Sequence, residues 1–306
     1  MVISGKVVED PFNFEVNLKV FILVLILPNL CFGQMISNEL DCLDEATIVF
    51  NSEFIKRNKI KSIKGRVSVK KPRQVIRTTN LFTHYFFDEN GRVTSSFEQN
   101  DFGTVVWRKY VYNDKGYLIY QSVGGQWDFN YTTYLFDDSI RVVAKDEFAR
   151  IGYNIVIPYT KEVSNESYSY LYKDSSLIKT IKNHAGTPYM RHLLFFNDKG
   201  RISRQENRYI ATNEGSICYF EYNTQGKVTL SNKVSSKQGL DIQKDQFAYD
   251  ELGNLKEIKH FKKGVMILET QFIVNQETGL LSAILKQEGS SNNLKITRFQ
   301  TYEYYD

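Results

Sequence analysis

The residues of this chain best suited to do chemistry are cations gathered in one stretch. Between residues 54 and 87 there are ten Lys or Arg residues and no Asp or Glu. Such a run predicts a surface patch for an anionic partner, such as an acidic glycan, a lipid head group or a protein. The competing interpretation is a solvated edge strand that its lysines protect from pairing. The candidate binding residues of this stretch are Lys59, Lys61, Lys64 and Arg66.

Four aromatic residues are the other binding candidates. Trp107 and Trp127 lie outside the positions at which aromatic residues recur along this chain, so a surface contact is open to them. Tyr153 and Tyr159 lie in a stretch that interrupts the recurrence. At the recurring positions we expect instead a core of cross-strand aromatic pairs, each contributing about 0.2–1 kcal/mol.

The sequence lacks the motifs of the common enzyme classes. It has no G-x-S-x-G, no phosphate-binding glycine loop and no H-E-x-x-H, and its four histidines lack the spacing of zinc ligands. Aspartates at the predicted turns are explained by turn initiation rather than by calcium binding. We therefore expect no enzymatic activity, no metal and no cofactor. A glycan-active enzyme stays an alternative, because paired carboxylates need not be close in sequence.

A strand–turn–strand unit must position these residues. Phe247 and Tyr249 are two residues apart and share one face of a strand. Asp250 can start a turn, Gly253 supplies a positive φ for a type I turn followed by a bulge, and Leu255 resumes an apolar position. Related units begin at residues 85, 110, 134, 170, 194, 220 and 272. Neighbouring units are 24 to 27 residues apart, except for a gap of 36 between residues 136 and 172, which indicates an insertion.

The pattern aromatic-x-aromatic-Asp/Asn-x-x-Gly-x-apolar resembles the YD-repeat family of Rhs and teneurin-type shells, over residues 85–305. That resemblance implies a long antiparallel sheet that spirals and sometimes encloses a cavity. With about eight ~25-residue hairpin units over residues 81–306, we predict an all-β, antiparallel repeat sheet that is twisted or partly coiled. We expect no closed shell, and we expect one continuous domain.

The first 33 residues are predicted to be a secretory signal peptide. Lys19 precedes an apolar run from residue 20 to residue 27, and Gly33 is a small residue at the expected cleavage site. The protein is therefore expected in the periplasm, on the outer surface or secreted, with nucleic acid an unlikely partner. Without this segment the chain has 37 basic and 32 acidic residues, a net charge of +5, and no transmembrane helix. Cys42 and Cys218 form either a disulfide or two buried thiols.

Residues 34–80 are predicted to cap the repeats with a helix and a basic strand. Leu43, Ala46, Phe50 and Phe54 fall on one face of a helix over residues 43–57, and Asp41 is its expected N-cap. Since the end of a repeat array is otherwise open, we expect this helix to plug one end.

These features predict an exported binding or structural protein of the cell surface or periplasm, which contacts another protein or an anionic polysaccharide. An outer-membrane β-barrel is the main rival. Against it, residues 255–261 place charged side chains on both faces of a strand, so either face would bring charge into lipid. An immunity or inhibitor protein that covers a toxin is a third alternative.

Overall fold

The computed structural model describes residues 35, 50–99, 103–125, 129–138, 141–151, 159–173, 176–251 and 253–306, without the side chains of residues 150, 151, 159 and 160. All of them belong to a single compact unit, residues 34–306. The predicted signal peptide and residues 36–49 of the predicted cap lie outside the described residues.

The described part of the chain is built almost entirely of strands. Its one helix is α2, Ser52–Arg57. The strands are β1 Ile60–Lys70, β2 Arg77–Phe87, β3 Val93–Gln99, β4 Val105–Tyr112, β5 Leu118–Gly124, β6 Phe129–Phe136, β7 Val142–Ile151, β8 Tyr159–Lys173, β9 Ser176–Lys182, β10 Pro188–Phe196, β11 Ile202–Tyr209, β12 Gly215–Tyr222, β13 Val228–Ser235, β14 Asp241–Tyr249, β15 Leu255–Lys262, β16 Val265–Val274, β17 Leu281–Glu288 and β18 Leu294–Tyr304.

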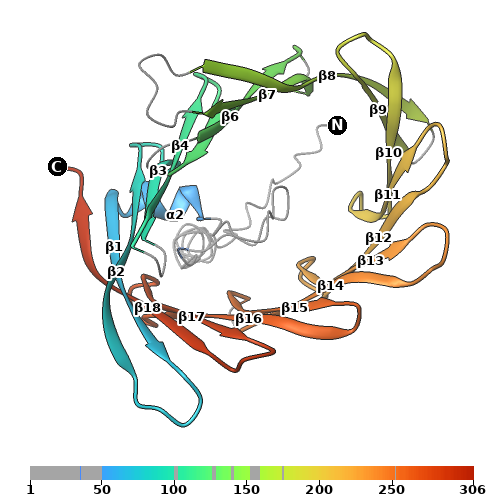
Figure 1. The fold of residues 1–306 in the computed structure, drawn as a ribbon. Coiled ribbons are helices and arrows are strands. Elements are labelled where there is room, and N and C mark those ends of the chain that lie inside the picture. Colours follow the sequence, from blue (N-terminus) through green and yellow to red (C-terminus); the bar gives the residue numbers. More distant parts are fainter. Residues whose placement is uncertain are drawn as a thin grey trace, which may run out of the picture. The chain divides into compact units, whose positions relative to one another are not determined.

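The 18 strands form one antiparallel sheet that closes on itself (Figure 1). Each strand pairs with its neighbours in sequence, and β18 pairs with β1 from Ile60 opposite Tyr304 to Lys70 opposite Leu294. The prediction of an open, partly coiled sheet is therefore wrong, although the all-β antiparallel class is confirmed. The physical reason is that β18 opens a ninth hairpin unit, and β1, from the other end of the chain, supplies its returning strand. The basic strand is consequently not an edge.

The predicted turns are confirmed. Asp88 accepts hydrogen bonds through Oδ1 from the amides of Asn90 and Arg92, at 3.0 and 2.9 Å. Gly91 has φ +78°, and a register shift follows in the β2–β3 ladder, as a turn with a bulge requires. The same arrangement recurs where Asn replaces Asp, as at Asn223. The predicted insertion is the long β7–β8 hairpin.

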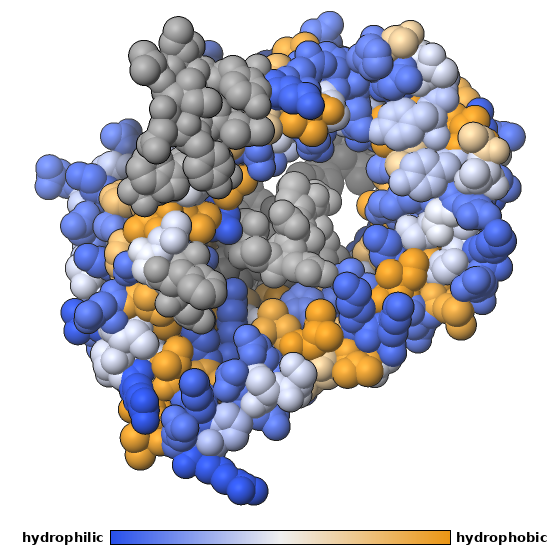
Figure 2. Space-filling model, viewed as in Figure 1, coloured by the Kyte–Doolittle hydropathy of each residue, from blue (hydrophilic) through white to orange (hydrophobic). Residues whose placement is uncertain are grey.

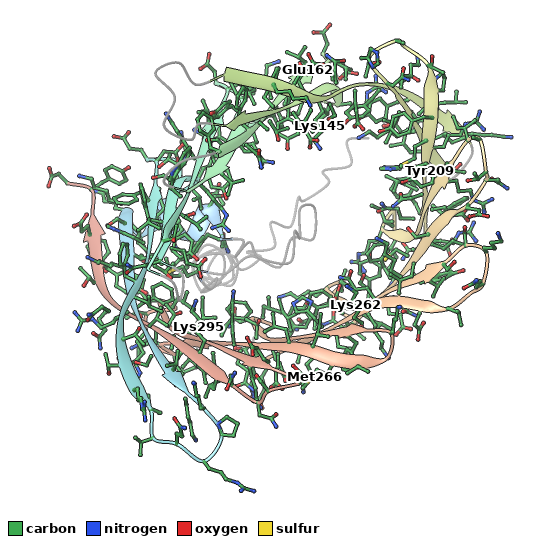
Figure 3. The ribbon with its side chains drawn as sticks, viewed as in Figure 1. Lys145, Glu162, Tyr209, Lys262, Met266 and Lys295 are labelled. Atoms are coloured by element: carbon green, nitrogen blue, oxygen red, sulfur yellow. The ribbon has the colours of Figure 1, made fainter. Side chains whose placement is uncertain are left out.

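Alternate side chains face the inside and the outside of the barrel, as the two-residue period of a strand dictates. In Figure 3, Lys145 and Lys262 point inward, whereas Glu162 and Met266 point outward. The strand registers extend this assignment around the sheet. Figure 2 shows an opening between the strands and a rim made mainly of hydrophilic residues.

The apolar core lies on the inner side of β1, β2 and β13–β18, at the end of the barrel that carries the predicted turns. Phe50 lies 4.8 Å from Tyr85 and 5.0 Å from Phe87, measured between ring centroids. Phe54 and Ile55 of α2 are buried in the same cluster. The helix packs against the β2–β3 turn so closely that a Cβ on Gly91 would lie 2.0 Å from the Ser52 carbonyl oxygen. α2, Ser52–Arg57, thus packs at this end of the barrel, whereas residues 43–49 of the predicted helix lie outside the described residues, so the predicted cap stays a prediction.

Two details of the prediction need correction. The N-cap of α2 is Asn51, whose Oδ1 accepts a hydrogen bond from the Phe54 amide at 3.1 Å, so Asp41 does not cap this helix. The recurring aromatic positions do not form the core throughout. Phe87, Phe247 and Phe272 are buried there, but Tyr172 is 66% exposed.

The second aromatic residue of the aromatic-x-aromatic pattern makes a recurring contact between neighbouring hairpins. The hydroxyl of Tyr249 donates a 2.6 Å hydrogen bond to the carbonyl oxygen of Val228, and that of Tyr222 does the same to Ile202. An equivalent bond joins Tyr112 to Val93, and a different one, from the Tyr305 hydroxyl to the Phe87 carbonyl oxygen, crosses the closure. These bonds link each hairpin to its neighbour and satisfy carbonyl groups at the strand ends.

Among the described residues, no helix is long and apolar enough to cross a membrane. Cys218 lies half-buried on the inner face of β12, with its Sγ 3.2 Å from Oγ of Ser231. Its predicted partner, Cys42, lies outside the described residues, so the choice between a disulfide and two thiols stays a prediction.

Candidate functional site

A groove on the outer face of β18, β1 and β2 gathers the basic residues that closure of the barrel brings together. It has a volume of about 350 Å³. It is lined by Lys64, Gly65, Arg66, Asn80, Leu81, Phe82, Arg298, Gln300 and Thr301. We call this the basic groove.

Strand register places three cations side by side in the basic groove. Arg66 on β1 lies directly opposite Arg298 on β18 and, on its other side, opposite Phe82 on β2. Lys64 is two residues before Arg66, so both side chains leave the same face of β1, about 7 Å apart along the strand. The side chains of Lys64, Arg66 and Arg298 are all exposed. The Lys64 ammonium group lies 5.6 Å from the centre of the Phe82 ring.

The charges of the basic groove are not balanced by neighbouring acids. No carboxylate is among the described residues that line it, and directly opposed like charges on a sheet are unfavourable. A second pair of outward arginines, Arg191 and Arg208, also lies in register on β10 and β11. There, however, Glu206 forms a 2.6 Å ion pair with Arg208. Arg66 and Arg298 form no comparable ion pair within the described part of the chain.

A small polar network of Ser62, His84 and Glu303 lies at one end of the basic groove. The Ser62 hydroxyl donates a 2.9 Å hydrogen bond to Glu303, and its oxygen lies 3.2 Å from Nε2 of His84. Burial, together with the nearby Lys64 charge, lowers the pKa of His84. Glu303 is thus committed to Ser62 and closes one end of the positive surface.

The structure divides the predicted basic residues. Lys64 and Arg66 line the basic groove, and their binding of an anion stays a prediction. Lys59 instead donates a 3.0 Å hydrogen bond from Nζ to the backbone carbonyl oxygen of Asp306. Lys61 lies beside Tyr305, with Nζ 5.9 Å from the ring centre. Lys59 and Lys61 therefore hold the C-terminal residues rather than line the basic groove.

The predicted aromatic residues do not join this site. Trp107 lies half-buried on the outer face of β4, where Nε1 donates a 3.1 Å hydrogen bond to the Gly125 carbonyl oxygen. Its ring lies 5.6 Å from that of Phe129. Tyr159 begins β8, but its side chain is not among those described. Trp127 and Tyr153 lie outside the described residues.

Sequence reasoning missed Arg298, because this residue lies more than 200 positions from Arg66 in the chain. Only the β1–β18 register brings the two together. A signal was present in the chain end: Tyr302 and Tyr304 have the spacing of an opening strand that lacks its partner.

A second polar cluster, on the inner face of β8 to β10, was also missed. Glu166 accepts hydrogen bonds from the hydroxyls of Tyr168 and Tyr189, the first at 2.8 Å. The Lys179 ammonium group lies 3.7 Å from the Tyr168 ring centre. Burial lowers the pKa of Lys179 and, helped by the Lys179 charge, that of His192 to about 4. The polar groups of this cluster contact one another, so we assign the cluster a structural role.

Comparison with known proteins gives structural matches alone. No family model matches the chain, and no curated protein matches it. A porin-like protein from Bacteroides uniformis is 10% identical, with a TM-score of 0.33 over 80% of this chain and 98% of that one. A LolA superfamily protein from Nitrosomonas europaea is 7% identical, with a TM-score of 0.21 over 83% and 91%. A DUF1329 family protein from Desulfovibrio piger is 6% identical, with a TM-score of 0.23 over 83% and 91%.

The resemblance to YD-repeat proteins is wrong. No family model supports it, and the hairpins close into an 18-stranded barrel. The shared features are those of any regular hairpin with an Asp or Asn turn and a bulge, namely a polar first residue, a glycine and flanking aromatics. A local turn pattern therefore defined the hairpins but not the family.

Proposed function

We propose that this protein is an exported, non-enzymatic binding protein that holds an anionic polysaccharide in the basic groove. The observation that carries the proposal is the Arg66–Arg298 pair, two exposed guanidinium groups opposed across β1 and β18 with no carboxylate lining the groove. A bound sulfate or carboxylate group would relieve this repulsion, and guanidinium groups bind both anions in bidentate fashion.

The lining of the basic groove suits a sugar polymer better than a small ion. Asn80, Gln300 and Thr301 offer hydrogen-bonding groups for hydroxyls, and Phe82 offers an apolar surface. Lys70 continues the positive face of β1 beyond Arg66 and is exposed. The described lining holds no Asp, Glu, Cys or His, which supports binding rather than turnover.

An aqueous location is part of the proposal. On the outer face, Glu257 pairs with Lys259 at 2.9 Å, and Glu206 lies between Arg204 and Arg208 at 3.1 and 2.6 Å. Such mid-strand charges are unfavourable in a lipid-facing band. Together with the predicted signal peptide, they support a periplasmic, surface or secreted protein, whose partner is unlikely to be nucleic acid.

The test is the binding of fluorescent dextran sulfate to the purified protein, with uncharged dextran of equal length as the ligand control. The double variant R66A/R298A should weaken binding at least tenfold. It should also lower the slope of log affinity against log salt by about two, since two counterion-releasing contacts are lost.

The control variant is R191A/K259A, which removes two outward cations that lie outside the basic groove. It should bind like the unmodified protein. If both double variants lose equal affinity for dextran sulfate, binding follows net charge rather than the basic groove. If uncharged dextran binds as tightly as dextran sulfate, binding does not depend on ionic contacts. Equally tight binding of a short DNA duplex would refute selectivity for polysaccharide.

A further inference from the structure

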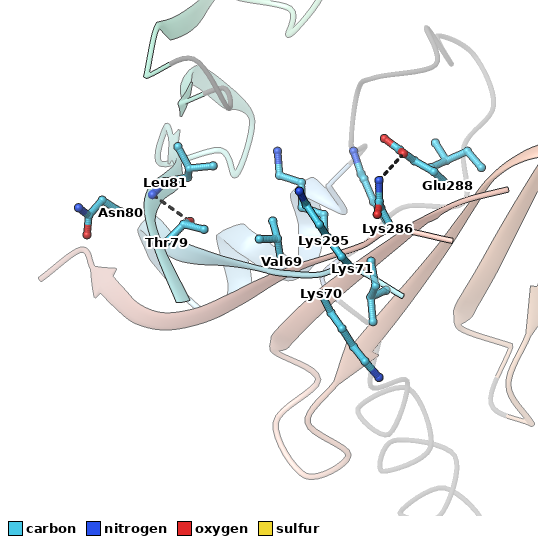
Figure 4. Close-up of a pocket in the computed structure, with 12 residues that line it drawn as sticks. Val69, Lys70, Lys71, Thr79, Asn80, Leu81, Lys286, Glu288 and Lys295 are labelled. Carbon is cyan, nitrogen blue, oxygen red and sulfur yellow. Dashed lines mark hydrogen bonds between the residues drawn. The ribbon is translucent and has the colours of Figure 1, made fainter. Parts of the chain in front are cut away.

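A cavity of about 480 Å³ opens beside the β1–β2 and β17–β18 hairpins, at the end of the barrel opposite α2 (Figure 4). It is lined by Val69, Lys70, Lys71, Thr79, Asn80, Leu81, Leu268, Lys286, Glu288, Asn293, Leu294 and Lys295. Its volume is in the range of sites that hold a small organic molecule. We call it the lysine cavity; it shares Asn80 and Leu81 with the basic groove, but its inward lysines, Lys286 and Lys295, do not line that groove.

Two lysines face each other on the inner wall of this cavity. Lys286 on β17 lies opposite Lys295 on β18, and opposite Thr270 on β16. Figure 4 shows Lys286 and Lys295 on one side of the sheet, with Lys70 on the other. Like charges in register on one face are unfavourable, and here they also lie on the inner, less hydrated side.

Only one of the two lysines has an acidic partner. The Lys295 ammonium group lies 3.4 Å from Oε1 of Glu98. The other carboxylate oxygen, Oε2, lies 3.9 Å from the Arg108 guanidinium group. Lys286 has no ion pair or hydrogen bond with any described residue. Desolvation lowers the pKa of Lys286, and the charges of Lys295 and Arg108 lower it further against the opposing effect of Glu98.

The remaining carboxylate of the cavity does not neutralise Lys286. Glu288 is exposed, and its Oε2 accepts hydrogen bonds from the Ser291 hydroxyl at 2.6 Å and from Asn293 Nδ2 at 3.4 Å. Lys286, Lys295 and Arg108 therefore outnumber the two inward carboxylates beside them, those of Glu98 and Glu288. This leaves an excess of positive charge on the wall, next to the apolar side chains of Leu81 and Leu268.

We propose that the lysine cavity binds an amphipathic anion, with a carboxylate or phosphate head group between Lys286 and Lys295 and an apolar chain against Val69, Leu81 and Leu268. A bound anion supplies the partner that Lys286 lacks, and the apolar wall shields the ion pair from water. Neither a purely apolar ligand nor a small hydrophilic anion would use both halves of the site.

The test uses decanoate below its micelle concentration as the probe, with decanol and citrate as the two half-ligands. Isothermal titration of the purified protein should give decanoate the highest affinity of the three. Lys286→Met keeps the length of the side chain and removes its charge, so it should weaken decanoate binding at least tenfold. It should leave the protein folded, because it removes an unpaired, desolvated charge.

The matched control is Lys262→Met, which removes another inward lysine that does not line the cavity. Decanoate should bind this variant normally. On the unmodified protein, a lysine-selective NMR titration should show a large shift of the Lys286 signal. Octyl phosphate in the same assays separates a preference for phosphate from one for carboxylate. Decanol binding as tightly as decanoate, or a Lys286 signal that does not move, would overturn the proposal.

Discussion

Gly65 provides the sharpest test of how the barrel closes. It lies on the inner face of β1, opposite Phe299 of β18 and Thr83 of β2. A Cβ at this position would lie 2.7 Å from Cγ2 of Thr297, and 2.9 and 3.0 Å from two carbons of the Phe299 ring. Phe299 is buried in the core cluster, so it has little room to move. We predict that Gly65→Ala destabilises the protein.

The magnitude follows from two opposing terms. Replacing a glycine within a strand by alanine favours folding by about 0.5–1 kcal/mol, because the unfolded chain loses freedom. Overpacking a tight core costs about 1–3 kcal/mol. The net prediction is a loss of roughly 0–2.5 kcal/mol in the free energy of unfolding. Phe299→Leu removes two of the three close contacts and leaves the one to Thr297, so Gly65→Ala should cost less in that background.

The assay is urea unfolding followed by circular dichroism, for the two single variants and the double variant. The coupling energy should fall within about 0.5–3 kcal/mol, as for residues in contact. Phe272→Leu, a change at another buried core position, is the control background and should leave the cost of Gly65→Ala unchanged. If Gly65→Ala stabilises the unmodified protein, Thr297 and Phe299 do not cover Gly65, and the β1–β18 register is refuted.

Three further predictions concern charge and hydrogen bonding. Arg298→Glu places an opposite charge across from Arg66, so the free energy of unfolding should rise by about 0.2–1 kcal/mol while dextran sulfate binding falls; a loss of stability would contradict the repulsion. Burial lowers the pKa of His192 to about 4, from its ordinary 6.5. Its contribution to the free energy of unfolding is therefore complete above pH 6.5 and is lost as the pH falls toward 4, by up to about 3 kcal/mol. The stability of His192→Gln should lack this part of the acid dependence. Tyr249→Phe should cost about 0.5–1.5 kcal/mol by thermal unfolding, because the Val228 carbonyl loses its 2.6 Å hydrogen bond; an unchanged melting temperature would show that water replaces the hydroxyl.

Much of the local structure could be predicted because it depends on neighbours in sequence. The Asp88 and Gly91 turn, and its equivalents, follow from side-chain hydrogen bonding and positive φ within five residues. Alternation identified the strands and their aromatic faces. Closure could not be read in this way, because the pairing of β1 with β18 depends on how twist and bulges accumulate over all the intervening strands.

The candidate site was predictable to the same extent. The run of cations between residues 54 and 87 was visible, and the two-residue period of β1 explains why Lys64 and Arg66 share a face. The sequence did not predict which cations lie next to one another, because Arg298 reaches the basic groove only through the pairing of β18 with β1. The same holds for Lys286 and Lys295, which are nine residues apart across a hairpin whose register sets them opposite one another.

The most direct test of the central claim is a disulfide across the closure. Residues 66 and 298 are in register, and such cross-strand pairs have Cα atoms about 4.5–5.5 Å apart, within the range that a disulfide spans. In a protein with Cys31, Cys42 and Cys218 changed to serine, R66C/R298C should oxidise to an intramolecular disulfide in the monomer, whereas R66C/R191C should not. Free thiols in R66C/R298C, or bonds only between molecules, would contradict a barrel closed by β1 and β18.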